Sequence, residues 1–251
     1  MGSPWFEPAA PRVLAHRGLA LDAPENTLLA FEHAVRAGAG YLETDVHLSA
    51  DGAAVIAHDP ELGRVAPGRT ERVADLTADA LRRIDLGHGQ GFPTLIEALD
   101  AFPAARFNID VKTDPAVAAT VEAIRAADAR DRVLLTAFSD ARRRRLAAML
   151  PGVVTSAGRA SVLRARAASV VGNPAVLRRA VAGAQVLQIP ERVGRVPLLT
   201  PRLLERAHAA GLEVHVWTVN VEADMRRLLR LGVDGIVTDR ADVALRVVSG
   251  S

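Results

Sequence analysis

The sequence predicts an α/β fold, a TIM (β/α)8 barrel with a small insertion after the second strand, and three observations lead to this prediction. The chain has 251 residues, about the length at which one such barrel buries a large core. Eight short apolar runs alternate with segments of helical periodicity, as expected for parallel strands joined by helices. Residues 59–93 break this alternation with Gly, Pro and charged residues. We therefore expect one domain, 1–251, with 59–93 inserted over the active-site face.

The first strand is expected at 12–15, where a short apolar run leads directly into His16, Arg17 and Gly18. Polar residues and a glycine at the end of a strand indicate a loop that belongs to a site. Residues 24–37 are expected to form an amphipathic helix, because apolar residues recur there at helical spacing and a glycine follows. These segments form the first strand, loop and helix unit.

The second strand, 41–48, carries two acids where a buried strand favours apolar residues. Successive side chains alternate between the two faces of a strand, so Glu43 and Asp45 point the same way. Two neighbouring carboxylates repel each other and lose hydration unless a cation lies between them, and a hard metal ion with oxygen ligands suits that position. This strand is therefore predicted to form one wall of an active site.

An Asp51-Gly52 pair follows the second strand, and this pair is typical of the two-residue turn of a β-hairpin. The returning apolar run is 54–57. If Asp51 and Gly52 form the turn, counting outward from it places Asp45 directly opposite His58. The hairpin is therefore expected to bring an imidazole to the level of the two acids.

Beyond the insertion, where one short helix is expected near 78–83, strands and helices alternate again. The predicted strands are 106–112, 133–137, 153–157, 185–189, 213–218 and 235–238. The predicted helices are 95–101, 115–127, 140–149, 161–170, 174–182, 201–210, 221–231 and 241–248. Active-site groups of a parallel barrel lie at the carboxyl ends of its strands. The polar or aromatic residues at these ends are His16, Arg17, Glu43, Asp45, Asp110, Lys112, Trp217 and Asn220.

Two of these strand-end residues stand out by their type. Lys112 is the only lysine in the chain, and Asp110 shares its strand face. A chain that uses arginine for every other basic residue would be expected to use it here too, so the lysine indicates a need for a compact ammonium group. Trp217 is interpreted as an apolar wall for a substrate.

The residue types define the chemistry. A divalent ion held by Glu43, Asp45 and Asp110 is the expected cofactor. Together with the cations Arg17 and Lys112, such an ion would form a site suited to a phosphate group. The two histidines are natural general acids and bases near neutral pH. The sequence has no Walker loop or nucleotide-binding fingerprint, which favours hydrolysis of a phosphodiester over transfer from ATP.

Composition restricts the partners and the location. The formal net charge is only +2, so the sequence pI of about 9.8 reflects arginine content and predicts no nucleic-acid partner. Cysteine is absent, which excludes disulfides and thiolate sites. Residues 1–15 lack the pattern of a signal peptide, and no apolar run reaches about 18 residues, so no stable membrane anchor is expected. We expect a cytoplasmic protein, and the sequence gives no indication of its oligomeric state.

At the level of motifs, the chain resembles the glycerophosphodiester phosphodiesterases of the small bacterial cytosolic type. The resemblance extends from Val13 to about Asp239. The motifs that carry it are His16-Arg17-Gly18, Pro24-Glu25-Asn26-Thr27, Glu43-Thr44-Asp45-Val46, His58-Asp59-Pro60, Asn108-Ile109-Asp110-Val111-Lys112, Trp217-Thr218-Val219-Asn220 and residues 232–239.

The resemblance implies metal-dependent hydrolysis of a small-molecule glycerophosphodiester to sn-glycerol 3-phosphate and an alcohol. The mechanism usually drawn for the family has the glycerol 2-hydroxyl attack phosphorus, and water then opens the resulting cyclic phosphate. The implied roles are acid and base for His16 and His58, Mg²⁺ or Ca²⁺ ligands for Glu43, Asp45 and Asp110, and phosphate ligands for Arg17 and Lys112. In the family the third metal ligand is usually glutamate, whereas this chain has an aspartate with a shorter side chain.

Three alternatives stay open, and the two that are enzymes would use much the same residues. A lyase would stop at the cyclic phosphate, and a phospholipase D would act on lysophospholipids. A non-catalytic barrel would bind only metal and anion, although the presence of both histidines disfavours it.

Overall fold

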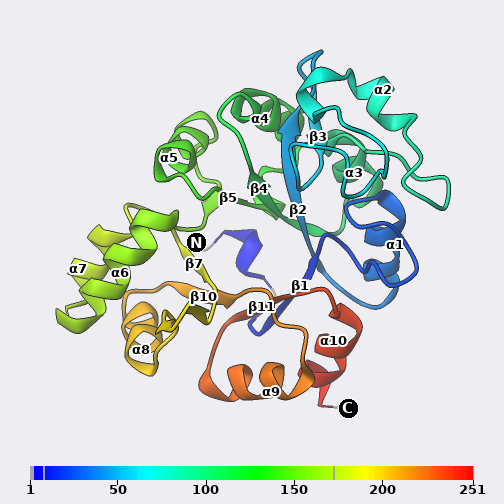
Figure 1. Ribbon diagram of the computed structural model, residues 1–251. Helices are drawn as coiled ribbons and strands as arrows, with labels where there is room; N and C mark the ends of the chain where they lie inside the picture. Colours follow the sequence, from blue (N-terminus) through cyan, green and yellow to red (C-terminus); the bar gives the residue numbers. More distant parts are fainter. Residues whose placement is uncertain (1–2, 8, 172, 251) are drawn as a thin grey trace.

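The computed structural model describes residues 3–7, 9–171 and 173–250, so Pro8, one of the prolines of the N-terminal arm, lies outside the described residues. Within these ranges, eight parallel strands stand in the order β6-β5-β4-β2-β1-β11-β10-β7, and a bridge between Ser156 and Val186 joins the two ends of the sheet. The strands therefore close into a barrel, as predicted (Figure 1). They are β1 Arg12–His16, β2 Tyr41–Leu48, β4 Arg106–Val111, β5 Val133–Thr136, β6 Val154–Thr155, β7 Val186–Ile189, β10 Glu213–Val216 and β11 Gly235–Thr238.

Helices surround the barrel (Figure 1). They are α1 Leu28–Arg36, α2 Ala78–Arg82, α3 Leu95–Ala101, α4 Ala116–Ala126, α5 Asp140–Met149, α6 Arg159–Val171, α7 Pro174–Ala180, α8 Pro201–Ala209, α9 Glu222–Leu231 and α10 Ala241–Ser249, with 3-10 helices η1 Pro4–Phe6, η2 Val73–Asp75 and η3 Arg130–Arg132. Among the described residues, none of these helices combines the length and the apolar character that crossing a bilayer requires.

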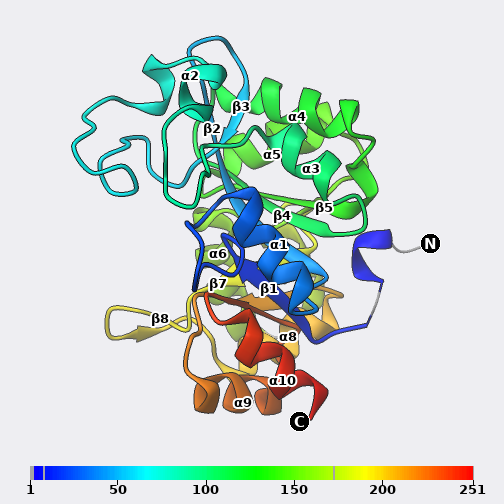
Figure 2. The same ribbon diagram turned by 90° about the vertical axis from the view of Figure 1, so that its right-hand side faces the viewer.

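The amino-terminal end of the barrel is filled by apolar and aromatic side chains. Trp5 in η1 is fully buried, and its ring stands edge-to-face on Tyr41 at 5.0 Å between centroids. The buried guanidinium of Arg12 donates to the Tyr41 hydroxyl at 2.5 Å and to Glu213 at 2.8 Å. In Figure 2 the N-terminal segment lies on one side of the barrel, and the long loops project from the other. The predicted site residues lie at the opposite end, where the carboxyl ends of the strands meet.

Helix α1 begins later than the sequence predicts. Thr27 is its N-cap and accepts a hydrogen bond from the Ala30 amide, so the helical residues start at Leu28. The preceding Asn26 has φ +57, in the left-handed region that a helix excludes. Residues 24–27 are thus a loop at the carboxyl end of the barrel, and their polar side chains are free to join a site.

The hairpin register differs by one residue from the expected one. β3, Ala54–Ile56, pairs with β2 so that Val55 lies opposite His47, and the backbone of Asp45 accepts from Ala57, not from His58. The turn has three residues between Ser49 and Ala53, because Gly52 adopts φ +84 and the Ser49 side chain bonds both Asp51 and the Ala53 amide. The predicted pairing of Asp45 with His58 was therefore wrong, because the third residue of a glycine-ended loop shifts the returning strand.

Residues 59–93 fold around a small apolar cluster of their own, which includes Leu62, Val73, Leu81 and Phe92. A second projection was not predicted. It is a short hairpin of β8 Arg192–Val193 and β9 Val196–Pro197, between β7 and α8. Figure 2 shows both projecting on the side of the barrel opposite the N-terminal segment.

Candidate active site

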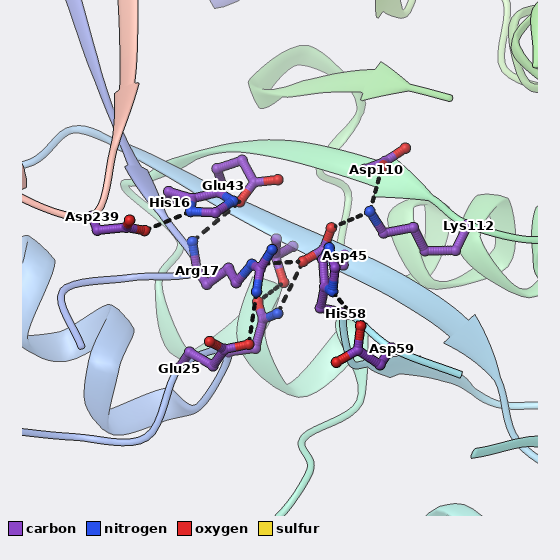
Figure 3. Close-up of polar contacts among 12 residues, drawn as sticks. His16, Arg17, Glu25, Glu43, Asp45, His58, Asp59, Asp110, Lys112 and Asp239 are labelled. Atoms are coloured by element: carbon purple, nitrogen blue, oxygen red, sulfur yellow. Dashed lines mark hydrogen bonds and ion pairs between the residues drawn. The ribbon is translucent and has the colours of Figure 1, made fainter. Parts of the chain in front are cut away.

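One cavity of about 590 Å³ lies at the carboxyl ends of the strands. All eight of the sequence-predicted site residues line it: His16, Arg17, Glu43, Asp45, His58, Asp110, Lys112 and Trp217. They come from β1, β2 and β4 and from the segments that follow β1, β3, β4 and β10, so the barrel brings together positions as far apart in sequence as His16 and Trp217. Figure 3 shows the polar members pointing toward one another.

His16, the last residue of β1, is held by an aspartate from the far end of the chain. Its Nδ1 lies 2.6 Å from Asp239 Oδ1 (Figure 3). Asn220 in turn donates to the other oxygen of Asp239 at 2.6 Å. Burial opposes the charged ring, but the Asp239 hydrogen bond and the nearby Glu43 carboxylate raise the pKa of His16 above its usual value. Nε2, 3.9 Å from Glu43, faces the cavity. His16 is thus prepared to hold a proton at Nε2.

His58 has an equivalent arrangement on the other side of the site. Its Nδ1 lies 2.7 Å from Asp59 Oδ1, and its carbonyl lies 3.1 Å from His47 Nε2. Arg64 of the 59–93 segment binds the second oxygen of Asp59 and also donates to Glu25 at 2.6 Å. The His58 ring is therefore fixed through Nδ1, and Nε2 is the ring nitrogen left for chemistry.

Arg17 follows β1 in a conformation that the next residue makes possible. Arg17 has φ +56 and Gly18 has φ +85, and a Cβ on Gly18 would stand 2.6 Å from the Ala30 backbone of α1. The turn directs the guanidinium back over β2, where it donates to Glu25 at 2.9 Å and lies 3.4 Å from Asp45. A cation held this way can bind an anion above Asp45.

Lys112 stands between two buried carboxylates. Its Nζ lies 2.7 Å from Asp45 Oδ1 and 2.6 Å from Asp110 Oδ2 (Figure 3). Burial disfavours the ammonium, but the charges of Asp110 and Asp45 raise the pKa of Lys112 above its usual value. Burial alone would also raise the pKa of Asp45, yet Lys112 lowers it. The lone lysine therefore remains charged and links β2 to β4.

Glu43 is the least compensated carboxyl group of the site. Its burial and the charge of Asp45 raise the pKa of Glu43 to about 8. Asp110 Oδ1 is buried and, among the described residues, has no hydrogen-bond partner. A raised pKa and an orphaned oxygen are both signs that a positive charge is missing at this point.

The donor set fits a hard divalent ion by its chemistry, because it consists of carboxylate oxygens from Glu43, Asp45 and Asp110. As these side chains stand, however, no group of three or more His, Cys, Asp or Glu side chains in the described ranges is arranged to hold a metal ion. In this arrangement the Lys112 ammonium lies between Asp45 and Asp110. Lys112 contacts one oxygen of each carboxylate, so Oδ1 of Asp110 remains available to an ion.

Five residues that contact the candidate site residues received no role in the sequence analysis, although all but Arg64 stand in the motifs quoted there: Glu25, Asn26, Asp59, Arg64 and Asp239. Asn26 donates to Asp45 Oδ2 at 3.1 Å and accepts from the Thr44 hydroxyl, so it fixes a predicted metal ligand. Glu25 joins Arg17 to Arg64. The available signals were the polar Glu-Asn pair ahead of a helix and an aspartate adjacent to a site histidine. Arg64 gave no signal, because its segment lacks periodicity.

Trp217 forms part of the opposite wall of the cavity. Its ring stands edge-to-face on Phe138 at 6.1 Å between centroids, and both residues line the cavity. This placement agrees with the interpretation of Trp217 as an apolar wall, and Phe138 extends it.

Comparisons with known proteins agree with the family that the sequence motifs resemble. Residues 16–243 match the family described as the Glycerophosphoryl diester phosphodiesterase family. A Mycobacterium tuberculosis protein named "Probable glycerophosphodiester phosphodiesterase 2" is 42% identical over 234 residues, covering 92% of this chain and 88% of that protein. The crystal structure of a glycerophosphodiester phosphodiesterase from Agrobacterium tumefaciens is 27% identical with a TM-score of 0.77, over 95% of this chain and 99% of that one. An Oleispira antarctica phosphodiesterase, solved in complex with the product sn-glycerol-3-phosphate, shares the fold at 24% identity and a TM-score of 0.81, over 96% and 97% of the two chains.

Proposed function

The chain belongs to the glycerophosphoryl diester phosphodiesterase family of hydrolases, and from this premise we propose that it hydrolyses small glycerophosphodiesters to sn-glycerol 3-phosphate and an alcohol. The observation that carries the proposal is the pair of histidines. Each has Nδ1 fixed to an aspartate, and each lines a cavity that also contains two cations and three carboxyl groups. Such a pair suits proton transfer on opposite sides of one phosphorus atom.

Phosphate binding is assigned to Arg17 and Lys112. The guanidinium offers paired N–H donors, and the ammonium supplies a compact point charge. Both are already anchored by carboxylates, Arg17 by Glu25 and Lys112 by Asp45 and Asp110. Little conformational entropy is therefore lost when the substrate binds, and the phosphodiester is oriented between the histidines.

The proton transfers are assigned from the raised pKa of His16 and from the position of His58 across the cavity. His58 takes the proton of the glycerol 2-hydroxyl, whose oxygen forms the new bond to phosphorus. His16, whose raised pKa favours the imidazolium, gives its Nε2 proton to the departing alcohol oxygen as the old P–O bond breaks. In the second half, neutral His16 removes a proton from water. The water oxygen attacks phosphorus, and His58 returns its proton to the 2-oxygen as the cyclic ester opens.

A divalent ion, Mg²⁺ or Ca²⁺, would be held by Glu43, Asp45 and Asp110. When bound, it would supply positive charge that stabilises the extra negative charge on the phosphoryl oxygens. The raised pKa of Glu43 and the orphaned oxygen of Asp110 support this assignment.

The function is tested with glycerophosphocholine, glycerophosphoethanolamine, glycerophosphoglycerol and glycerophosphoinositol as substrates. Release of glycerol 3-phosphate, followed by an enzymatic assay and by phosphorus NMR, is the expected result in the presence of Mg²⁺ or Ca²⁺. A cyclic phosphate as the end product would identify a lyase. Binding of these diesters without release of any product would identify a non-catalytic barrel.

We also propose that the chain works as one domain, with residues 59–93 at the rim of the site. The contacts of Arg64 with Asp59 and Glu25 support this, because Asp59 holds the His58 ring and Glu25 holds Arg17. Location in the cytoplasm stays a prediction.

Replacing Lys112 with arginine is expected to lower kcat/KM by at least ~10-fold, about 1.4 kcal/mol of transition-state stabilisation. The planar guanidinium cannot occupy the position where Nζ lies between Asp45 and Asp110 at 2.7 and 2.6 Å. Steady-state kinetics on the best diester measures the effect. Arg130→Lys, at an exposed arginine outside the cavity, is the matched control. Unchanged kcat/KM and unchanged Tm in Lys112→Arg would remove Lys112 from the phosphate ligands.

Replacing Arg64 with glutamine is expected to lower kcat by about 10-fold, about 1.4 kcal/mol. Without the guanidinium, Asp59 loses the contact that fixes it against His58 Nδ1. The pH profile of kcat should shift as well, because the charge next to the imidazole becomes mobile. Arg69→Gln, in the same segment but paired only with Glu71, is the control. Identical kinetics of the two variants would show that Arg64 has no positioning role.

A further inference from the structure

The active-site cavity has a second half that carries almost no charge. Besides the polar groups, it is lined by large apolar side chains that are exposed to solvent: Phe138 at 59%, Leu163 at 55%, Val193 at 57% and Val196 at 60% of their surface. With Trp217 these residues are named the apolar wall. Arg159 is the one charged residue among the cavity-lining residues on this side.

The apolar wall is built by four separate segments. Phe138 follows β5, Leu163 lies on α6, and Trp217 follows β10. Val193 and Val196 are directly paired across the β8–β9 hairpin, so both side chains lie on the same face, the face that lines the cavity. No residue of 59–93 lines the cavity among those described. Among the described residues, the apolar wall is therefore formed by barrel segments and by the β8–β9 hairpin, and not by residues 59–93.

Exposed apolar side chains are common singly on protein surfaces, but a contiguous group within a cavity indicates an apolar ligand. The reaction centre needs only the polar half, since glycerol and phosphate are both polar. The whole cavity, about 590 Å³, has the size of sites that enclose ligands with a substantial apolar part. A hydrocarbon chain covering the wall would remove both its own surface and that of these side chains from water.

We infer that the apolar wall is a subsite for one hydrocarbon chain, so that the preferred substrates are single-chain amphiphilic glycerophosphodiesters. This inference rests on the proposed function and specifies its substrate class. The chain has two possible points of attachment. It is carried either by the alcohol that leaves, or by the 1-oxygen of the glycerol, as in a lysophospholipid.

The inference is tested by binding, which needs no turnover. Two series of diesters are titrated into His58→Ala by calorimetry, below their critical micelle concentrations. One series has n-alcohols of increasing length on the phosphate, and the other has glycerophosphocholine with n-alkyl ethers of increasing length on the 1-oxygen. A fully buried methylene contributes about 0.8 kcal/mol, so a chain lying half-buried along the wall should tighten Kd by about 2-fold per methylene. The series that shows this slope identifies the point of attachment.

Matched variants locate the effect. In the same background, Val193→Ser with Val196→Ser should reduce the slope while leaving the Kd of the shortest diester unchanged. Val170→Ser with Val171→Ser is the control, because these valines on α6 are exposed to 55% and 67% but do not line the cavity. A flat dependence on chain length in both series overturns the inference. So does a slope that is the same with and without the Val193 and Val196 changes. Failure of the unmodified protein to release product from any diester would instead count against the proposed function.

Discussion

Replacing His58 with alanine is expected to lower kcat by about 10²- to 10⁴-fold, the range for a lost general acid or base. His16→Ala should have an effect of similar size, because the two rings act on different atoms of the same displacement. Neither change should unfold the protein, since both rings line the open cavity and their aspartate partners are partly exposed to solvent. The measurement is single-turnover release of glycerol 3-phosphate at saturating substrate. His33→Ala, on α1 and outside the cavity, is the control.

The pH dependence separates the two roles. If His16 is the acid in the first step, activity falls as pH rises through its pKa, which Asp239 and Glu43 raise above the usual histidine value. Asp239→Asn removes a negative charge from Nδ1, so the pKa of His16 should fall and the alkaline limb of kcat should move to lower pH. An alkaline limb that stays in place in Asp239→Asn, or wild-type kcat in either alanine variant, would contradict the assignment.

The strands and helices were predictable because their periodicity reflects burial. Helices α3 and α5 match the expected 95–101 and 140–149 residue for residue. The errors occur where the backbone conformation, and not the side-chain pattern, determines where a helix begins or how two strands pair. Asn26 and Gly52 adopt positive φ, and each moved the boundary or register of an element without changing the hydrophobic pattern. The β8–β9 hairpin escaped prediction because each strand has only two residues, too few to show alternation.

The residues that line the candidate cavity were predictable where residue type was unusual for its position, as with acids and a lone lysine on buried strands. Residues that act through another residue were harder to find. Asp239 and Asp59 each fix a histidine, yet an aspartate in a loop is unremarkable in sequence. Each aspartate contacts Nδ1 of a histidine ring, and only the three-dimensional structure shows which ring nitrogen an aspartate contacts.

Removal of divalent ions is expected to lower the rate of diester hydrolysis by about 10³-fold or more, about 4 kcal/mol, and readdition of Mg²⁺ or Ca²⁺ should restore it. Without an ion Glu43 has little counter-charge, because the Lys112 ammonium lies between Asp45 and Asp110 and the His16 ring is 3.9 Å away. Chelation, followed by titration with each ion separately, measures the requirement and identifies the preferred ion. Full activity in a metal-free sample would overturn it.

A second readout of the same site does not depend on activity. In the metal-free protein the pKa of Glu43 is raised from 4.5 to about 8, so between these values the folded state holds more protons than the unfolded state. Stability should therefore fall as pH rises from about 5 to 8, by up to about 1.4 kcal/mol per pH unit. Glu43→Gln cannot ionise and should lack this component.

An ion bound to Glu43 favours its charged form, so adding Mg²⁺ or Ca²⁺ at pH 8 should raise the Tm of the wild type far more than that of Glu43→Gln. Thermal unfolding of both proteins, with and without the ion, gives the difference directly. Other groups that titrate in this range cancel in the comparison, because they are common to both proteins. Equal Tm shifts in the two proteins would mean that the ion binds elsewhere and that Glu43 is not one of its ligands.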